Sequence, residues 1–293
     1  MKNPLLTNAG LTYYRRLSQS LSRLLGTHVL SKLDREFLSE VIRRDREVLG
    51  RIENWVPPRL IEDSIFRYGV NPNVEKLLNS QLDSDCTHAD LLAYFGRKMK
   101  GPCRYLELGV SVGKTLWQIL NTCGPCDCWG FDIEELTPVL KQHFVQQSRE
   151  EWPSPENSIK KAPSSISRFI HPDSGSKITY ISADIFDARA WQLLANGRFN
   201  LVLSDALHTP EALDFEWQQM TTLNIFDPNE VVIMWDDLDG NMRDWFDRKS
   251  ESIASHLHVG RERVGLHLVN GWLGNAEFPH RLGFALKTPA PNL

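Results

Sequence analysis

Short apolar runs alternate with amphipathic segments over most of the chain. The apolar runs predict buried β-strands at Arg104–Leu108, Cys128–Phe131, Lys177–Ser182, Asn200–Leu203 and Val231–Trp235. Helical spacing after these runs predicts helices at about 113–122, 138–150, 188–194, 210–224 and 242–255. Two last strands are expected near 264–273 and 282–286. Strands that alternate with helices favour an α/β fold, here a doubly wound, mostly parallel seven-stranded sheet that ends in an antiparallel hairpin.

Residues 1–85 form a predicted N-terminal helical extension, and residues 86–293 form the predicted α/β domain. Within the extension, helical spacing around Leu17–Leu25 predicts one helix, and a second is expected from about Lys32 to Glu53. The charged run Arg43–Glu47 indicates that one face of this second helix is solvated. The α/β core does not need the extension, which is therefore expected to act as a lid or as the contact of a homodimer.

Two further segments precede or interrupt the alternation of strands and helices. Thr87 is expected to be the N-cap of a helix that runs through Met99, with its apolar side turned inward. The segment 152–175 contains several prolines and serines. It is predicted to be a long surface insertion with a short helix around 165–169.

Composition limits the classes of protein that fit the chain. Hydrophobic residues make up 41% and charged residues 24%, which is ordinary for a soluble globular protein. The net charge of −4 does not indicate a nucleic-acid partner. The sequence shows neither an apolar run that could span a membrane nor the apolar core of a secretory signal. A cytoplasmic protein with no membrane partner is therefore expected.

The five cysteines are expected to be reduced thiols, because their number is odd and no signal sequence precedes them. The tetrapeptide Cys123–Cys126 has the spacing of a thioredoxin-type redox site. Redox chemistry requires that spacing at the start of a helix, where a thiolate is stabilised. Here the tetrapeptide follows a predicted helix and precedes a strand, so a connecting turn is the favoured interpretation.

A glycine turn follows the first strand, at the start of the next predicted helix. The segment Glu107–Gly113 has the spacing Glu-x-Gly-x-x-x-Gly, which differs from the G-x-G-x-x-G of dinucleotide-binding proteins. Glycines allow close approach of a ligand, and the free N–H groups of a helix start favour its electronegative groups. A tight turn without a ligand is the alternative.

Acidic residues lie at the ends of all five central strands. They are Glu107, Asp132, Asp184, Asp205, Asp236 and Asp237. The carboxyl ends of parallel strands share one edge of a sheet, where ligands of such folds bind, so these side chains are expected to converge. Any single one could instead be a helix cap or a turn residue.

These motifs resemble those of class I S-adenosylmethionine (SAM)-dependent methyltransferases, over about residues 87–287. The strongest resemblance is to the metal-dependent small-molecule O-methyltransferases, which include catechol and caffeoyl-CoA enzymes and bacterial natural-product relatives. It implies a Rossmann-like fold. The extension and the segment 152–175 are not covered.

The resemblance also implies which residues bind SAM. Those that line its methionine part would be Glu107, Gly109, Ser111 and Gly113. Asp132 would bind the ribose hydroxyls, and a carboxylate can accept two hydroxyl donors. Asp184 would accept a hydrogen bond from the adenine amino group, with Ile185 or Phe186 against the ring.

In the metal-dependent families, the acids after the fourth and fifth strands hold a divalent ion. By resemblance, Asp205, Asp236 and Asp237 would hold Mg²⁺ or Mn²⁺, which prefer oxygen ligands. The ion would acidify a hydroxyl of the small-molecule acceptor. His208 would be the catalytic base, where catechol-type enzymes have a lysine.

Three alternatives remain open at this point. His208 could act as base in a metal-independent methyltransferase. An NAD(P)-linked oxidoreductase could use a similar sheet, although the dinucleotide spacing is missing. The chain could also be a binding protein without turnover. The acceptor itself, whether a phenol or a sugar in natural-product biosynthesis, is not predicted by the sequence.

Overall fold

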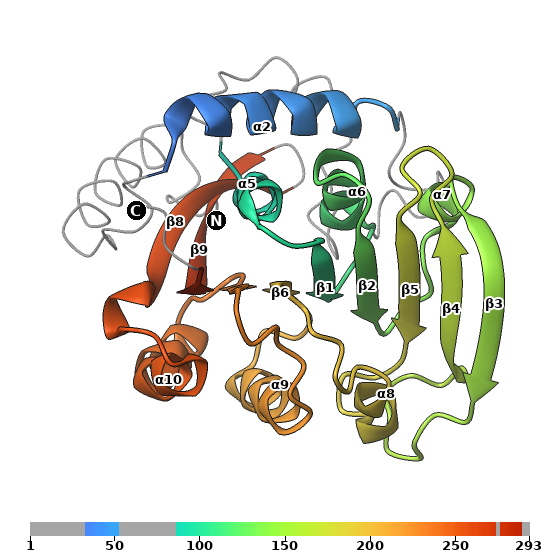
Figure 1. Cartoon of the computed structure of the whole chain (residues 1–293). Coiled ribbons are helices and arrows are strands. Elements are labelled where there is room, and N and C mark those ends of the chain that lie inside the picture. The colour runs from blue at the N-terminus through green and yellow to red at the C-terminus, as the bar shows by residue number, and fades with distance from the viewer. Residues whose placement is uncertain (1–32, 53–85, 274–275, 289–293) are drawn as a thin grey trace, which may run out of the picture.

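The computed structural model describes residues 33–52, 86–273 and 276–288 (Figure 1). The predicted helix around Leu17–Leu25 lies outside them. The strands are β1 (Arg104–Leu108), β2 (Asp127–Asp132), β3 (Val145–Trp152), β4 (Ser164–Ile170), β5 (Lys177–Ser182), β6 (Leu201–Ser204), β7 (Val231–Trp235), β8 (Val264–Leu273) and β9 (Ala276–Lys287). In the described part they form one sheet in the order β3-β4-β5-β2-β1-β6-β7-β9-β8.

The central strands β5, β2, β1, β6 and β7 are parallel, and β9 and β8 follow as an antiparallel hairpin. Leu106 in the middle of β1 is opposite Trp129 of β2 and Val202 of β6. The predicted Rossmann-like, mostly parallel sheet with a C-terminal hairpin is therefore confirmed. All five central strands fall within one residue of the predicted positions.

Helices cover both faces of the sheet (Figure 1). They are α2 (Arg35–Leu49), α5 (His88–Lys98), α6 (Lys114–Thr122), α7 (Pro138–Lys141), α8 (Ala188–Gln192), α9 (Pro210–Thr222) and α10 (Asn241–Leu257), with a short 3-10 helix η4 (Arg261–Arg263). Helices α5 and α6 pack on one face with α2 across them, and α8, α9 and α10 pack on the other. No helix within the described ranges combines the length and apolar character that a membrane crossing requires.

Two hydrophobic cores result, one on each face of the sheet. Leu92 and Leu116 belong to the core under α5 and α6. Trp191 and Phe246 belong to the core above α8 and α10. The tetrapeptide Cys123–Cys126 joins α6 to β2 as the predicted turn, and all five cysteines are free thiols.

The predicted length of the helix over 138–150 and the predicted short helix around 165–169 were wrong. Helix α7 ends at Lys141, and strands β3 and β4 replace the rest of the predicted helix and the predicted insertion with its short helix. Strand β4 pairs antiparallel with the free edge of β5, and β3 pairs with β4, so the described sheet has nine strands rather than seven. The polar strand β3 lies exposed at the edge, where charged residues discourage pairing with another chain, and it carries no apolar alternation that would reveal it.

The predicted solvated charges on α2 are in part buried. Arg46 is only 3% exposed and makes two hydrogen bonds to the Asp90 carboxylate, at 3.0 and 2.9 Å. Asp45 is fully buried, and its carboxylate accepts a hydrogen bond from the Thr122 hydroxyl at 2.7 Å. Burial raises the pKa of Asp45 well above its usual value. These pairs dock α2 onto α5 and α6, so this part of the extension belongs to the folded core.

The predicted N-cap of α5 is confirmed and connects to the same ion pair. The Thr87 hydroxyl accepts from the Asp90 backbone N–H, and the Asp90 carboxylate accepts from the Thr87 backbone N–H at 2.8 Å. Asp90 therefore caps its own helix while it pairs with Arg46. The lid or dimer role of the rest of the extension stays a prediction.

Arg46→Met should lower the free energy of unfolding by about 3–5 kcal/mol, because it leaves the buried Asp90 carboxylate without its ion-pair partner. Urea unfolding at neutral pH measures this change. Arg43→Met is the matched control on the same helix, because it removes only an exposed pair with Glu47 and should cost at most about 0.5 kcal/mol. Equal effects of the two substitutions would contradict the proposed docking role.

Candidate active site

The glycine turn after β1 lies at the carboxyl edge of the parallel strands. Gly109 and Gly113 have φ angles of +82° and +83°, which favour glycine, and Ser111 between them also has a positive φ of 54°. A Cβ atom on Gly109 would overlap the backbone carbonyl of Asp205 after β6. The turn is thus fixed directly beside the end of the neighbouring strand, and it opens helix α6 at Gly113.

Asp132, the last residue of β2, holds the glycine turn in place. One carboxylate oxygen, Oδ2, accepts hydrogen bonds from the backbone N–H groups of Val110 and Ser111 at 2.7 and 2.8 Å. The other, Oδ1, accepts from the Glu134 N–H at 2.8 Å. Burial raises the pKa of Asp132, and these N–H donors oppose that increase. A carboxylate has about four acceptor positions, so one position on Oδ1 remains for a ligand.

Glu107 lies within β1, beneath the turn. Its side chain is buried, and its Oε2 accepts a hydrogen bond from the Tyr105 hydroxyl at 3.0 Å. Burial raises the pKa of Glu107 well above its usual value, and the nearby Asp205 and Asp132 carboxylates add to the increase. This hydrogen bond ties Glu107 to Tyr105 of the same strand, and its predicted role in binding the methionine part of SAM stays a prediction.

Asp184 follows β5 and is also satisfied by three donors. Its Oδ2 accepts from the Ser158 hydroxyl at 2.8 Å and from the Ile159 N–H at 3.0 Å. Its Oδ1 accepts from the Phe186 N–H at 3.0 Å. Of the two apolar residues predicted to face a purine, Ile185 is buried in the core, whereas Phe186 is exposed.

Three predicted residues come together at the ends of β6 and β7. The ligand atoms of Asp205, His208 and Asp237 all lie within 4.8 Å of one another. His208 Nε2 is 3.0 Å from Asp205 Oδ1, and His208 Nδ1 is 3.3 Å from Asp237 Oδ2. Two carboxylates and an imidazole in this arrangement could hold a divalent cation.

In the absence of a cation, the carboxylates of this cluster favour the protonated form of His208. Burial raises the pKa of Asp205 to about 6. The hydrogen bond to Asp205 raises the pKa of His208 to about 9, and the charges of Asp205, Asp237 and Asp236 add to it. Because both ring nitrogens face carboxylates, His208 is an imidazolium near neutral pH and acts as the counter-charge of the cluster.

Asp236, which was predicted to share the metal site, is buried and contacts His88 of α5. Its Oδ1 accepts from the Asp237 N–H, and its Oδ2 is 3.4 Å from Nδ1 of His88. Among the described residues it is not in the group of three that could hold a metal.

His88 was missed by sequence reasoning. It is the first residue of α5, and its Nε2 lies 3.2 Å from the Thr115 hydroxyl of α6. No motif marks this position, because its contacts depend on how α5 packs beside α6 and β7.

Comparison with known protein-family models found no match, and comparison with curated proteins also found none. Among solved structures, the chain is similar to the O-methyltransferase from Bacillus cereus in complex with S-adenosylhomocysteine (SAH), with 11% identity, a TM-score of 0.42, and coverage of 92% of this chain and 97% of that one. It is also similar to the SAH-bound methyltransferase PaMTH1 from Podospora anserina, with 12% identity, a TM-score of 0.39, and coverage of 79% and 89%. Similarity at this level does not define a family or a function, so function is inferred from the sheet and the site.

His208→Gln should flatten the dependence of stability on pH in the metal-free protein. The folded-state pKa of His208 is raised from 6.5 to about 9, so its stabilisation is fully present below pH 6.5 and lost as pH rises through 9. The raised pKa of Asp205 acts only between 3.8 and about 6, outside that window. Since the His208 side chain is 37% exposed, solvent screening limits the effect to about 1 kcal/mol.

Urea unfolding with EDTA at pH 6.5 and 9 tests this prediction. Exposed His258, at the C-cap of α10, provides the control variant His258→Asn. An unchanged decline in stability in His208→Gln would show that this imidazolium does not stabilise the cluster.

Proposed function

We propose that the protein transfers a methyl group from SAM to a hydroxyl group of a small molecule, assisted by a divalent cation. The observation that carries this proposal is the juxtaposition of two sites on one sheet edge. The glycine turn with Asp132 forms one site, and the cluster of Asp205, His208 and Asp237 forms the other. Gly109, packed against the Asp205 backbone, joins them.

The residues of the first site fit SAM. The positive φ angles of Gly109 and Gly113 bring bare backbone to the edge, where the cofactor can approach closely. The remaining acceptor position on Asp132 suits a ribose hydroxyl, which is a hydrogen-bond donor. Asp184 likewise keeps one position on Oδ1, which suits the amino group of adenine.

The residues of the second site fit Mg²⁺ or Mn²⁺. Asp205 and Asp237 supply carboxylate oxygens from two strand ends, and partial exposure of the cluster leaves room for water and acceptor oxygens. When bound, a divalent cation would lower the pKa of an acceptor hydroxyl. It would also take over the role of the His208 proton as counter-charge to the two carboxylates.

His208 is then available as the base. The acceptor hydroxyl gives its proton to a ring nitrogen of His208, and an oxygen lone pair forms the new bond to the methyl carbon. The bond from that carbon to the sulfonium sulfur breaks, which leaves SAH and a methyl ether. In this role His208 must be neutral when the acceptor binds.

The metal-independent alternative is disfavoured by the charge of His208. The hydrogen bond to Asp205 and the neighbouring carboxylates raise the pKa of His208 to about 9, so the imidazolium form predominates at pH 7 when no cation is present. A protonated imidazole cannot accept the acceptor proton. A bound cation is therefore needed for His208 to act as the base.

SAH binding tests the first site. The protein should bind SAH in calorimetry, and Asp132→Ala should weaken binding by about 1–3 kcal/mol, because the charged acceptor and the support of the turn are both lost. Asp127→Ala, at the other end of the same strand, is the control. Binding of NAD(P)H without binding of SAH would favour the oxidoreductase alternative instead.

Metal dependence tests the second site. Asp237→Asn should lose most turnover and most Mg²⁺ affinity while it still binds SAH, because Asp132 and Asp184 are not members of the cluster. Asp247→Asn, an exposed acid of α10, should leave both properties unchanged. EDTA should abolish turnover and added Mg²⁺ or Mn²⁺ should restore it. Full turnover after thorough metal removal would rule out the metal-assisted mechanism.

A further inference from the structure

The loop that joins β3 to β4 crosses the carboxyl edge of the sheet at β2 and β5. Most of this loop is exposed, but Ser158 is buried and Lys160 is only 9% exposed, with exposed Ile159 between them. We call Ser158–Lys160 the strap. Burial of a serine hydroxyl and a lysine amine in a loop requires compensating partners, and both have them.

The first anchor of the strap is Asp184. The Ser158 hydroxyl and the Ile159 N–H both donate to its Oδ2, at 2.8 and 3.0 Å. The Ser158 hydroxyl oxygen in turn accepts from the Lys160 N–H at 3.0 Å, which closes a compact turn around the carboxylate. The rotation of the Asp184 carboxylate is therefore fixed, and Oδ1 is the oxygen that keeps an acceptor position.

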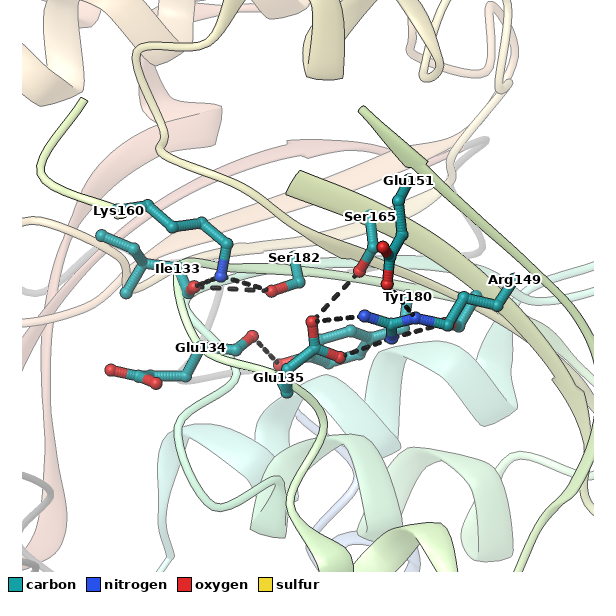
Figure 2. A network of polar contacts seen from close by, with 10 residues as sticks. Ile133, Glu134, Glu135, Arg149, Glu151, Lys160, Ser165, Tyr180 and Ser182 are labelled. Carbon is teal, nitrogen blue, oxygen red and sulfur yellow. Dashed lines mark hydrogen bonds and ion pairs between the residues drawn. The ribbon is translucent and has the colours of Figure 1, made fainter. Parts of the chain in front are cut away.

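The second anchor lies on the loop after β2. The Lys160 amine donates to the Ile133 carbonyl at 2.6 Å and to the Ser182 hydroxyl at 2.9 Å (Figure 2). Ile133 directly follows Asp132, and Ser182 ends β5. Lys160 thus holds the loop after β2 at a set distance from the loop after β5.

The same β2 loop is tied to the hairpin that carries the strap. Glu135 pairs with Arg149 of β3 through two hydrogen bonds, at 2.8 and 3.1 Å, and accepts from the Ser165 hydroxyl of β4 at 3.1 Å (Figure 2). The Tyr180 hydroxyl donates to the Glu134 carbonyl at 3.3 Å. The β3–β4 hairpin therefore positions both the strap and the loop that faces it.

We propose that Ser158 and Lys160 are positioning residues for the purine of the cofactor. This inference rests on the proposed function, in which Asp132 and Asp184 receive the nucleoside. Ser158 turns Asp184 Oδ1 toward the purine as a hydrogen-bond acceptor, which favours a 6-amino purine over a 6-oxo purine, because the latter presents an acceptor to an acceptor. Lys160 joins the loop after β2 to the end of β5, and so it sets the distance between the two sides of the proposed purine pocket.

The test compares SAH with its 6-oxo analogue, S-inosylhomocysteine, by calorimetry. Ser158→Ala should lower SAH affinity about fivefold to tenfold and shrink the preference for SAH over the 6-oxo analogue. Ser158→Thr keeps the hydroxyl and should restore that preference. Lys160→Met should weaken both ligands about tenfold with the preference retained, because it loosens the pocket without freeing Asp184.

Two control variants leave the contacts of the strap intact. Ser154→Ala removes a serine that bonds to Ala162 and Ser164 instead of Asp184. Lys177→Met removes the same charge as Lys160→Met, from an exposed side chain at the opposite end of β5. Both should bind the two ligands as the wild type does.

The outcomes separate this inference from the proposed function. If the wild type binds SAH and the Ser158 and Lys160 variants match the controls in affinity and preference, the strap has no role in purine binding and the proposed function stands. If the wild type binds no SAH, both fail. If Ser158→Ala does not fold, the comparison of Lys160→Met with Lys177→Met still decides whether the strap contributes to purine binding.

Discussion

The close approach of Gly109 to Asp205 is the constraint on which the rest of the site depends. The Gly109 N–H bonds to the Phe131 carbonyl of β2, and the Asp205 N–H bonds to the Leu108 carbonyl of β1. Any side chain at position 109 would overlap the Asp205 backbone. The turn that fits a cofactor and the loop that carries the acidic cluster are therefore held at contact distance by backbone alone, before any side chain is considered.

The carboxylates along this edge fall into two groups according to what balances their charge. Asp132 and Asp184 are each held by three hydrogen-bond donors, which fix the orientation of the carboxylate. Asp205 and Asp237 are balanced by His208, whose proton can leave. The first group suits precise recognition of a bound nucleoside. The second group suits replacement of the His208 proton by a cation. His208 is then neutral and can take a proton from the acceptor hydroxyl.

Helix α2 and the β3–β4 hairpin are additions to the seven-stranded core, and each brings a buried charged residue to it. Helix α2 is docked through the buried pair of Arg46 and Asp90, and Asp90 also caps α5. The first residue of α5, His88, reaches Asp236 beside the acidic cluster. On the opposite side of the site, the β3–β4 hairpin brings Lys160 to the ends of β2 and β5. Both additions thus connect structure outside the core to the edge that holds the site.

The sequence by itself determined the central strands, their alternation with helices and the acids at their ends, because buried parallel strands carry a continuous apolar signal and their ends follow from it. It also predicted that Asp205, Asp236 and Asp237 would converge beside His208, since adjacent parallel strands share one edge, and the structure brings Asp205, His208 and Asp237 together. Strands β3 and β4 were decided only by the tertiary structure, because an exposed edge strand needs no apolar alternation and β4 is defined by the free edge of β5. The burial of Arg46, the turning of Asp236 toward His88 and the anchoring of Lys160 were decided there too. Each depends on a partner far away in the chain, and the local sequence pattern that predicts a helix or a strand contains no information about which distant charge a side chain will meet.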